Sequence, residues 1–166
     1  MNEERPKFQP NPAFVDLLAR NFSRLLLLFI WLSVWFMYKH LPEIVPTHFN
    51  LKGEVDGYGS KYTLLLLPAL TSVLHLVFSV LLKYPEKFNY PVKITPANAQ
   101  LQYLLATRLL RWLNVAILIV FNSLLWLIYY SAVKAEAVHG LLIAVVLIVL
   151  TFVPLAIYFI ASFRKK

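Results

Sequence analysis

Four long apolar segments, separated by polar connections, dominate the pattern along the chain. The 21 residues from 62 to 82, for example, carry no formal charge. A transmembrane helix needs about 20 consecutive apolar residues. The pattern therefore predicts an all-α membrane protein, a bundle of four transmembrane helices over residues 22–40, 62–82, 112–133 and 141–163.

The segment ends indicate where these helices begin. The apolar run 25–38 has 14 residues and rises only about 21 Å, so its helix is expected to begin earlier, with Asn11 as the N-cap and Asp16 directed to water. Ser60 is the expected N-cap of the second helix, and Pro68 should kink that helix. A threonine–proline pair at 95–96 predicts the start of a long third helix.

Positive residues are distributed unevenly between the connections. Twelve of the 16 Lys and Arg residues lie in the N-terminal segment, in the connection 83–111 or at the C-terminus, and the other four lie in the two remaining connections. Because cytoplasmic connections carry the excess of positive residues, both termini are predicted in the cytoplasm. The net charge of +8 is therefore assigned to orientation in the membrane and not to nucleic-acid binding.

Composition limits the number of domains. Hydrophobic residues make up 60% of the chain and charged residues 14%, against roughly 25% charged in a soluble domain. Four spans would take about half of the 166 residues. The expected organisation is a single membrane domain over residues 1–166.

The first outer connection, LPEIVPTHFNLKGEVDGYGSK, has dense turn chemistry. It holds three of the four glycines, and a DG dipeptide is a strong turn signal. We expect an ordered exoplasmic loop, in which Lys61 pairs with Asp56 or Glu54. The amide of Asn50 can tie the backbone across the turn, and Gly53 and Gly59 allow positive φ there. These residues either only shape a tight loop or form a recognition surface. The candidate binding or recognition residues are Thr47, His48, Asn50, Gly53, Asp56, Gly57, Gly59 and Lys61.

This loop also carries a resemblance. The run PTHFN at 46–50, with Gly53 and DGYGSK at 56–61, resembles a bacterial membrane domain of unknown function found at the start of SdpI-type immunity proteins. Those proteins protect a Bacillus-type cell against its own secreted killing peptide and take part in signalling its presence, and they carry a second membrane domain. The resemblance implies a protein of the bacterial cytoplasmic (inner) membrane involved in immunity to, or sensing of, an exported peptide or envelope stress.

Polar side chains inside the predicted spans form a second candidate site. His75 is the only titratable side chain well inside a span, and Thr71 lies on the same helix face. We expect His75 to be hydrogen-bonded to Asn122, Thr151 or a serine of a neighbouring helix. One interpretation is structural hydrogen bonding between helices. The alternative is a small or accessory membrane transport protein with a polar path near His75.

Motifs for catalysis and cofactor binding are missing from the sequence. Neither HExxH nor GxSxG occurs, and the absence of cysteine excludes thiolate chemistry. Histidines predicted on the outer side have no spacing that specifies a metal site. We therefore expect a protein without catalytic residues, metal or cofactor, whose partners are the lipid bilayer and a peptide or another membrane protein. A membrane enzyme acting on lipid or peptidoglycan precursors is a third hypothesis, without a supporting motif.

Overall fold

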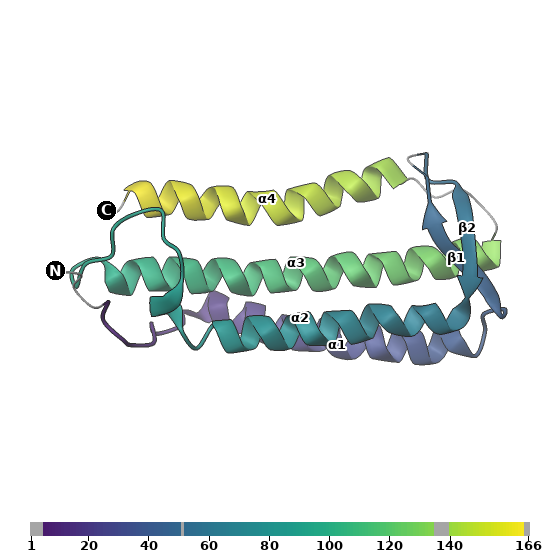
Figure 1. Cartoon of the computed structure of the whole chain (residues 1–166), viewed down its shortest axis with the longest axis horizontal. Helices are drawn as coiled ribbons and strands as arrows, with labels where there is room; N and C mark the ends of the chain where they lie inside the picture. The colour runs from purple at the N-terminus through teal and green to yellow at the C-terminus, as the bar shows by residue number, and fades with distance from the viewer. Residues whose placement is uncertain (1–4, 51, 135–139, 165–166) are drawn as a thin grey trace.

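The computed structural model describes residues 5–50, 52–134 and 140–164. Its elements in chain order are α1 (Phe14–Tyr38), β1 (Ile44–Phe49), β2 (Val55–Ser60), the 3-10 helix η1 (Lys61–Leu65), α2 (Leu66–Leu81), the 3-10 helix η2 (Pro85–Lys87), α3 (Ala99–Lys134) and α4 (Gly140–Arg164). The long helices run along one axis, and α3 lies between α4 and the pair formed by α1 and α2 (Figure 1). The two strands lie at the end of the helices opposite the chain termini.

Within the described residues, three helical segments are long and apolar enough to cross a membrane: Phe14–Tyr38, Lys61–Leu81 and Ala99–Lys134. In α4, residues Ile148–Arg164 form a shorter apolar helix. Many large apolar side chains point outward, including Leu66 and Leu76, which are 68% and 63% exposed. An exposed apolar surface on this scale is unusual for a soluble monomer. The structure is therefore that of a mostly helical membrane protein with three to four apolar helices.

A cluster of buried apolar residues lies near the strands. Ile30, Val34 and Met37 recur every three or four residues and are buried on one face of α1. They form one cluster with other buried residues from four further parts of the chain, Leu41, Val45, Leu64 and Leu125. Val45 belongs to β1, so the core joins the sheet to the helix ends.

The prediction of an all-α protein is wrong in the first outer connection. There, β1 and β2 form an antiparallel two-stranded sheet. The physical reason is local: β-branched residues favour extended backbone, and the sequences IVPTHF and VDGYGS flank a turn.

Two predicted helix features also differ from the structure. The helix α1 begins at Phe14, with Ala13 and not Asn11 at its N-cap, because the Asp16 carboxylate accepts a hydrogen bond from the Ala13 N–H at 2.9 Å. Pro68 lies in the first turn of α2 and not in its interior. A proline costs little in a first turn, because the N–H groups there have no partner within the helix. Ser60 caps η1 as expected, because its Oγ accepts from the Tyr62 N–H at 3.4 Å.

The connection between α2 and α3 is tied to the N-terminal segment. Arg5 donates hydrogen bonds to the carbonyl oxygens of Glu86 and Phe88, at 3.1 and 2.7 Å. Burial raises the pKa of Tyr90 well above its ordinary value. The phenol therefore keeps its proton and donates to the Pro85 carbonyl at 2.8 Å. These contacts hold the α2–α3 connection in place and join it to the N-terminal segment.

Candidate functional site

The strands β1 and β2, with the turn between them, form an outer hairpin over residues 44–60. Asn50 builds its turn, because Oδ1 accepts from the N–H groups of Lys52 and Glu54, at 2.9 and 3.0 Å, and Nδ2 donates to Glu54 Oε2 at 2.8 Å. Gly53 has a φ of 82°, in the left-handed region that favours glycine. The expected tie by Asn50 and the expected positive φ at Gly53 are both present.

Gly57 and Gly59 serve a different purpose from the one expected. Among the described glycines, positive φ occurs at Gly53. A Cβ on Gly57 would lie 2.9 Å from His48 Cβ, and a Cβ on Gly59 would lie 2.9 Å from Thr47 Cγ2. These two glycines therefore permit close approach of the strands, and the positive φ for which Gly59 was a candidate does not occur.

The outer hairpin presents polar and aromatic side chains to its surroundings. His48 Nδ1 lies 2.5 Å from Asp56 Oδ1, and these side chains are 72% and 44% exposed. Tyr58, two residues after Asp56, is 67% exposed. Residues alternate between the two faces of a strand, and Asp56, Tyr58 and Ser60 share the exposed pattern of β2. We call His48, Asp56 and Tyr58 the hairpin face.

Lys61 has a structural partner that sequence reasoning missed. Its Nζ lies 3.0 Å from Glu43 Oε1 and 4.7 Å from the centre of the Tyr38 ring. Its backbone N–H also donates to the Glu43 carbonyl at 2.9 Å. The expected pairing with Asp56 or Glu54 is therefore wrong, and Lys61 fastens the base of the outer hairpin.

A second polar site lies toward the other end of the helices, around Asp16. This carboxylate is fully buried, although the sequence predicts it in water. Arg108 binds it with two hydrogen bonds, Nε to Oδ1 at 2.9 Å and Nη2 to Oδ2 at 3.1 Å. Arg111 Nη1 lies 3.9 Å from Oδ1. Asp16 and Arg108 are 92 residues apart in the sequence. No local sequence pattern could therefore predict this contact.

The polar residues of the spans pair differently from expectation. His75 Nδ1 contacts Asn114 Nδ2 at 2.9 Å, so its partner is Asn114 and neither Asn122 nor Thr151. Asn122 Nδ2 instead donates to the carbonyl oxygen of Leu118 at 2.8 Å. The Thr71 hydroxyl donates to its own helix, to the Leu67 carbonyl at 2.8 Å. Thr151 is exposed on α4.

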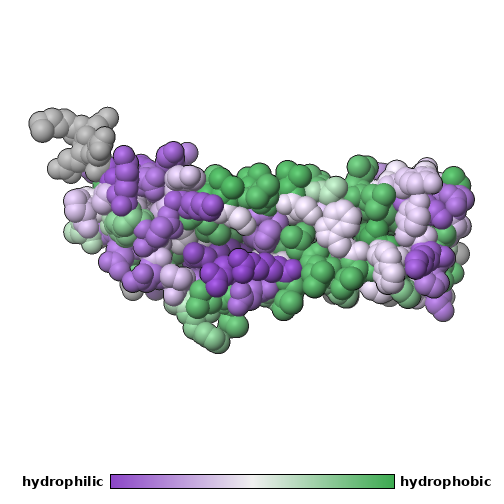
Figure 2. Space-filling model, turned by 90° about the horizontal axis from the view of Figure 1, so that it is seen from below, coloured by the Kyte–Doolittle hydropathy of each residue, from purple (hydrophilic) through white to green (hydrophobic). Residues whose placement is uncertain are grey.

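A cavity of about 300 Å³ opens between α1, α2 and α3 beside His75. Its lining residues are Arg20, Ser23, Arg24, His75, Ser79, Leu82, Lys83, Arg111 and Asn114. We call this the basic cavity. Figure 2 shows hydrophilic side chains reaching from the termini end into the hydrophobic band on the face of α1 and α2. Among the described residues, no group of three or more His, Cys, Asp or Glu side chains is placed to hold a metal ion.

Residues 25–71 of this mostly helical membrane protein match a family described as a domain of unknown function, DUF1648. The matched segment includes most of α1, the outer hairpin and the start of α2. A relative, described as an uncharacterized protein of Archaeoglobus fulgidus, is 39% identical over 70 residues. That alignment spans 37% of this chain and 38% of the relative. No solved structure matches the chain.

Proposed function

We propose that the chain is a non-enzymatic integral membrane protein of the SdpI-type first-domain group, built as a single membrane domain. Its outer hairpin would provide immunity to, or sensing of, an exported peptide or envelope stress. The observation that carries this proposal is the two-sided construction of the outer hairpin. Val45 is fully buried in the core cluster, whereas the hairpin face is exposed. A small sheet that packs against the core and also exposes polar and aromatic side chains suits recognition of a partner.

The free edge of β2 offers a mode of binding for an extended peptide. The sheet has two strands, and within the described residues β2 pairs only with β1. An extended peptide can add to such an edge through backbone hydrogen bonds. Gly57 and Gly59 add no side chains of their own to β2. Asp56 and Tyr58 would then supply charge and aromatic contact beside the added strand.

The proposed location is the bacterial cytoplasmic membrane, with both termini in the cytoplasm and four spans. The uneven distribution of positive residues supports this orientation. The hairpin, at the end opposite the termini, would then face outward, where an exported peptide meets it.

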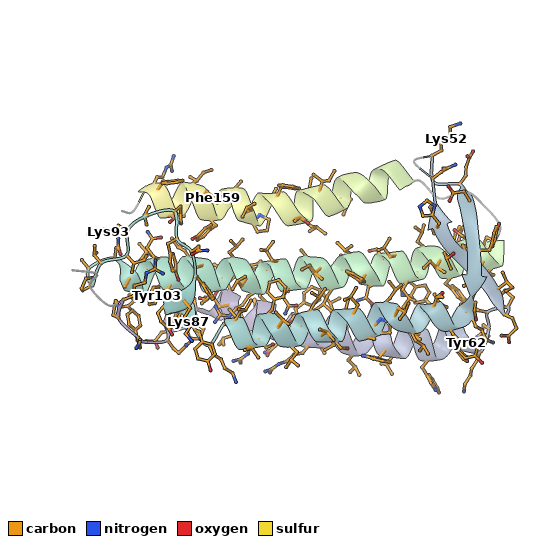
Figure 3. The ribbon with its side chains drawn as sticks, in the orientation of Figure 1. Lys52, Tyr62, Lys87, Lys93, Tyr103 and Phe159 are labelled. Atoms are coloured by element: carbon orange, nitrogen blue, oxygen red, sulfur yellow. The ribbon has the colours of Figure 1, made fainter. Side chains whose placement is uncertain are left out.

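A survival assay tests the proposal. The full chain is produced in a Bacillus-type strain that lacks its own immunity protein and is exposed to the secreted killing peptide. We expect protection by the chain and loss of protection in the His48→Ala/Tyr58→Ala variant at equal membrane abundance. The matched control is Lys52→Ala, an exposed residue of the hairpin turn (Figure 3). Equal protection by both variants, or none by the parent chain, would contradict the proposal.

The basic cavity supports a second candidate function, a small or accessory membrane transport protein. The supporting observation is that the cavity reaches His75 and is lined by polar side chains. Proteoliposomes containing the purified chain should then pass a small anion such as chloride. The flux should fall in the His75→Ala variant and remain in Ser72→Ala, because Ser72 lies outside the cavity lining and its hydroxyl donates to the Pro68 carbonyl and accepts from Trp31 Nε1. Absence of flux above empty vesicles would exclude this candidate.

A further inference from the structure

The basic cavity has a marked imbalance of charge. Four cationic side chains line it, and no carboxylate occurs among its described lining residues. Arg20 and Arg24 lie one turn apart on α1, Lys83 follows α2, and Arg111 lies on α3. Like charges repel more strongly as the surrounding dielectric constant falls. An anion held between them would relieve this repulsion.

The nearby carboxylate does not supply that anion. Asp16 already accepts two hydrogen bonds from Arg108 and one from the Ala13 N–H. Its distance of 3.9 Å to Arg111 Nη1 exceeds a hydrogen bond. Arg111 Nη1 is buried and has no hydrogen-bond partner among the described residues. A buried donor left without an acceptor is costly, so an acceptor bound beside Arg111 would be stabilising.

Buried polar groups of the basic cavity could bind a hydroxyl group attached to the anion. Asn114 is 5% exposed, and its Nδ2 contacts His75 Nδ1. When Nδ2 donates, Nδ1 is the acceptor, so the neutral ring carries its hydrogen on Nε2. Asn114 Oδ1 is buried and has no partner within the described part of the chain. It can accept a hydrogen bond from a hydroxyl group attached to the anion.

The basic cavity has exposed cationic side chains and exposed apolar side chains close to it in the same helices. Arg20, Arg24 and Lys83 are exposed at its rim. Exposed apolar side chains lie on the same helices, such as Phe22 at 45%, Leu25 at 62% and Leu76 at 63%. The volume of about 300 Å³ lies at the lower end of the range for small-molecule sites, roughly 300–1,000 Å³. A polar headgroup joined to apolar chains matches this combination.

We propose that the basic cavity binds the phosphate oxyanion of an anionic lipid whose headgroup carries a hydroxyl. Arg20, Arg24 and Lys83 neutralise the phosphate at the rim, and Arg111 donates to it from the floor. Arginine suits this role because its planar fork matches phosphate oxygens. Inorganic phosphate shares the same chemistry, without the apolar chains. The inference does not depend on the role proposed for the outer hairpin.

Thermal unfolding of the purified, delipidated full chain in detergent tests this proposal. Four tryptophans provide the fluorescence signal. The probes are phosphatidylglycerol, phosphatidylcholine and inorganic phosphate, each added separately. We compare Arg20→Gln/Arg24→Gln with the matched control Lys87→Gln/Lys93→Gln, which removes equal charge from exposed residues at the same end, outside the cavity lining (Figure 3). Phosphate retained per chain after purification is the second readout.

Phosphatidylglycerol should raise the melting temperature of the parent chain and of the lysine control by more than phosphatidylcholine does. The arginine variant should lose most of this shift and retain less phosphate. If the arginine variant is unfolded, Arg24→Lys serves instead and should lose part of the shift. Equal shifts in the arginine variant and the lysine control would overturn the proposal. A shift with inorganic phosphate alone would overturn the lipid source and assign the site to a free anion.

Discussion

Replacing Asp16 with asparagine tests the buried ion pair between α1 and α3. The substitution keeps the size of the side chain and one oxygen that can accept a hydrogen bond. It removes the negative charge that Arg108 contacts at 2.9 and 3.1 Å. We expect a large loss of stability, because Asp16 is fully buried and the Arg108 side chain is only 33% exposed.

The size of the effect follows from what remains after the substitution. Breaking a buried ion pair by removing one partner costs about 3–5 kcal/mol, because the other charge stays buried without compensation. Arg108 is partly exposed and regains some hydration, which favours the lower end of that range. The amide also weakens the contact to the Ala13 N–H, present at 2.9 Å, and loss of such a cap costs roughly 1 kcal/mol. The expected total is about 3–4 kcal/mol.

The assay is thermal or denaturant unfolding of the purified chain in one detergent, followed by tryptophan fluorescence. The matched control is Glu43→Gln, which removes one carboxylate from the Lys61 pair. Glu43 is 74% exposed, and Lys61, at 13% exposed, keeps its contact with the Tyr38 ring. Loss of this half-exposed pair should therefore cost only about 1 kcal/mol. A double-mutant cycle with Arg108→Gln separates the energy of the pair from that of the cap. If Asp16→Asn is no more destabilising than Glu43→Gln, the reasoning is refuted.

Two further substitutions and one loop replacement test other parts of the account. Gly57→Val should destabilise the hairpin by about 1–3 kcal/mol, since a Cβ there meets His48 Cβ at 2.9 Å; hydrogen exchange should show faster exchange in the strands, and unchanged protection would contradict this. Asn114→Leu should cost about 1–3 kcal/mol in unfolding measurements, because it leaves His75 without its partner; a variant as stable as the parent would argue against that contact. Replacement of residues 47–59 by a Gly/Ser linker of equal length should abolish protection from the killing peptide at unchanged expression, and retained protection would exclude a role for the hairpin.

Local patterns in the sequence predicted the helices well. The long helix beginning near residue 95 extends over Ala99–Lys134 in the structure, because apolar residues continue without a helix breaker. The segment predicted at 62–82 corresponds to Lys61–Leu81. Ser60 and Asn50 were identified from short-range chemistry, since a cap or a turn depends on neighbours a few residues away.

Contacts between segments distant in the sequence could not be predicted from local patterns. Asp16, three residues into α1, is typical of a solvated first turn, and only its packing against α3 makes it a buried partner of Arg108. The Asn114–His75 contact likewise depends on how α2 and α3 are rotated about their axes. The basic cavity is formed by three helices together, so its residues show no common motif.

Membrane orientation is the most direct test of the central claim that the hairpin faces outward and the termini face the cytoplasm. The chain has no cysteine, so single cysteines can be placed at Lys52 in the outer hairpin and at Lys87 in the α2–α3 connection. Intact cells are treated with a membrane-impermeant thiol reagent and compared with lysed cells. The account predicts labelling at position 52 in intact cells and at position 87 only after lysis. Labelling of position 87 in intact cells, with position 52 labelled only after lysis, would contradict it.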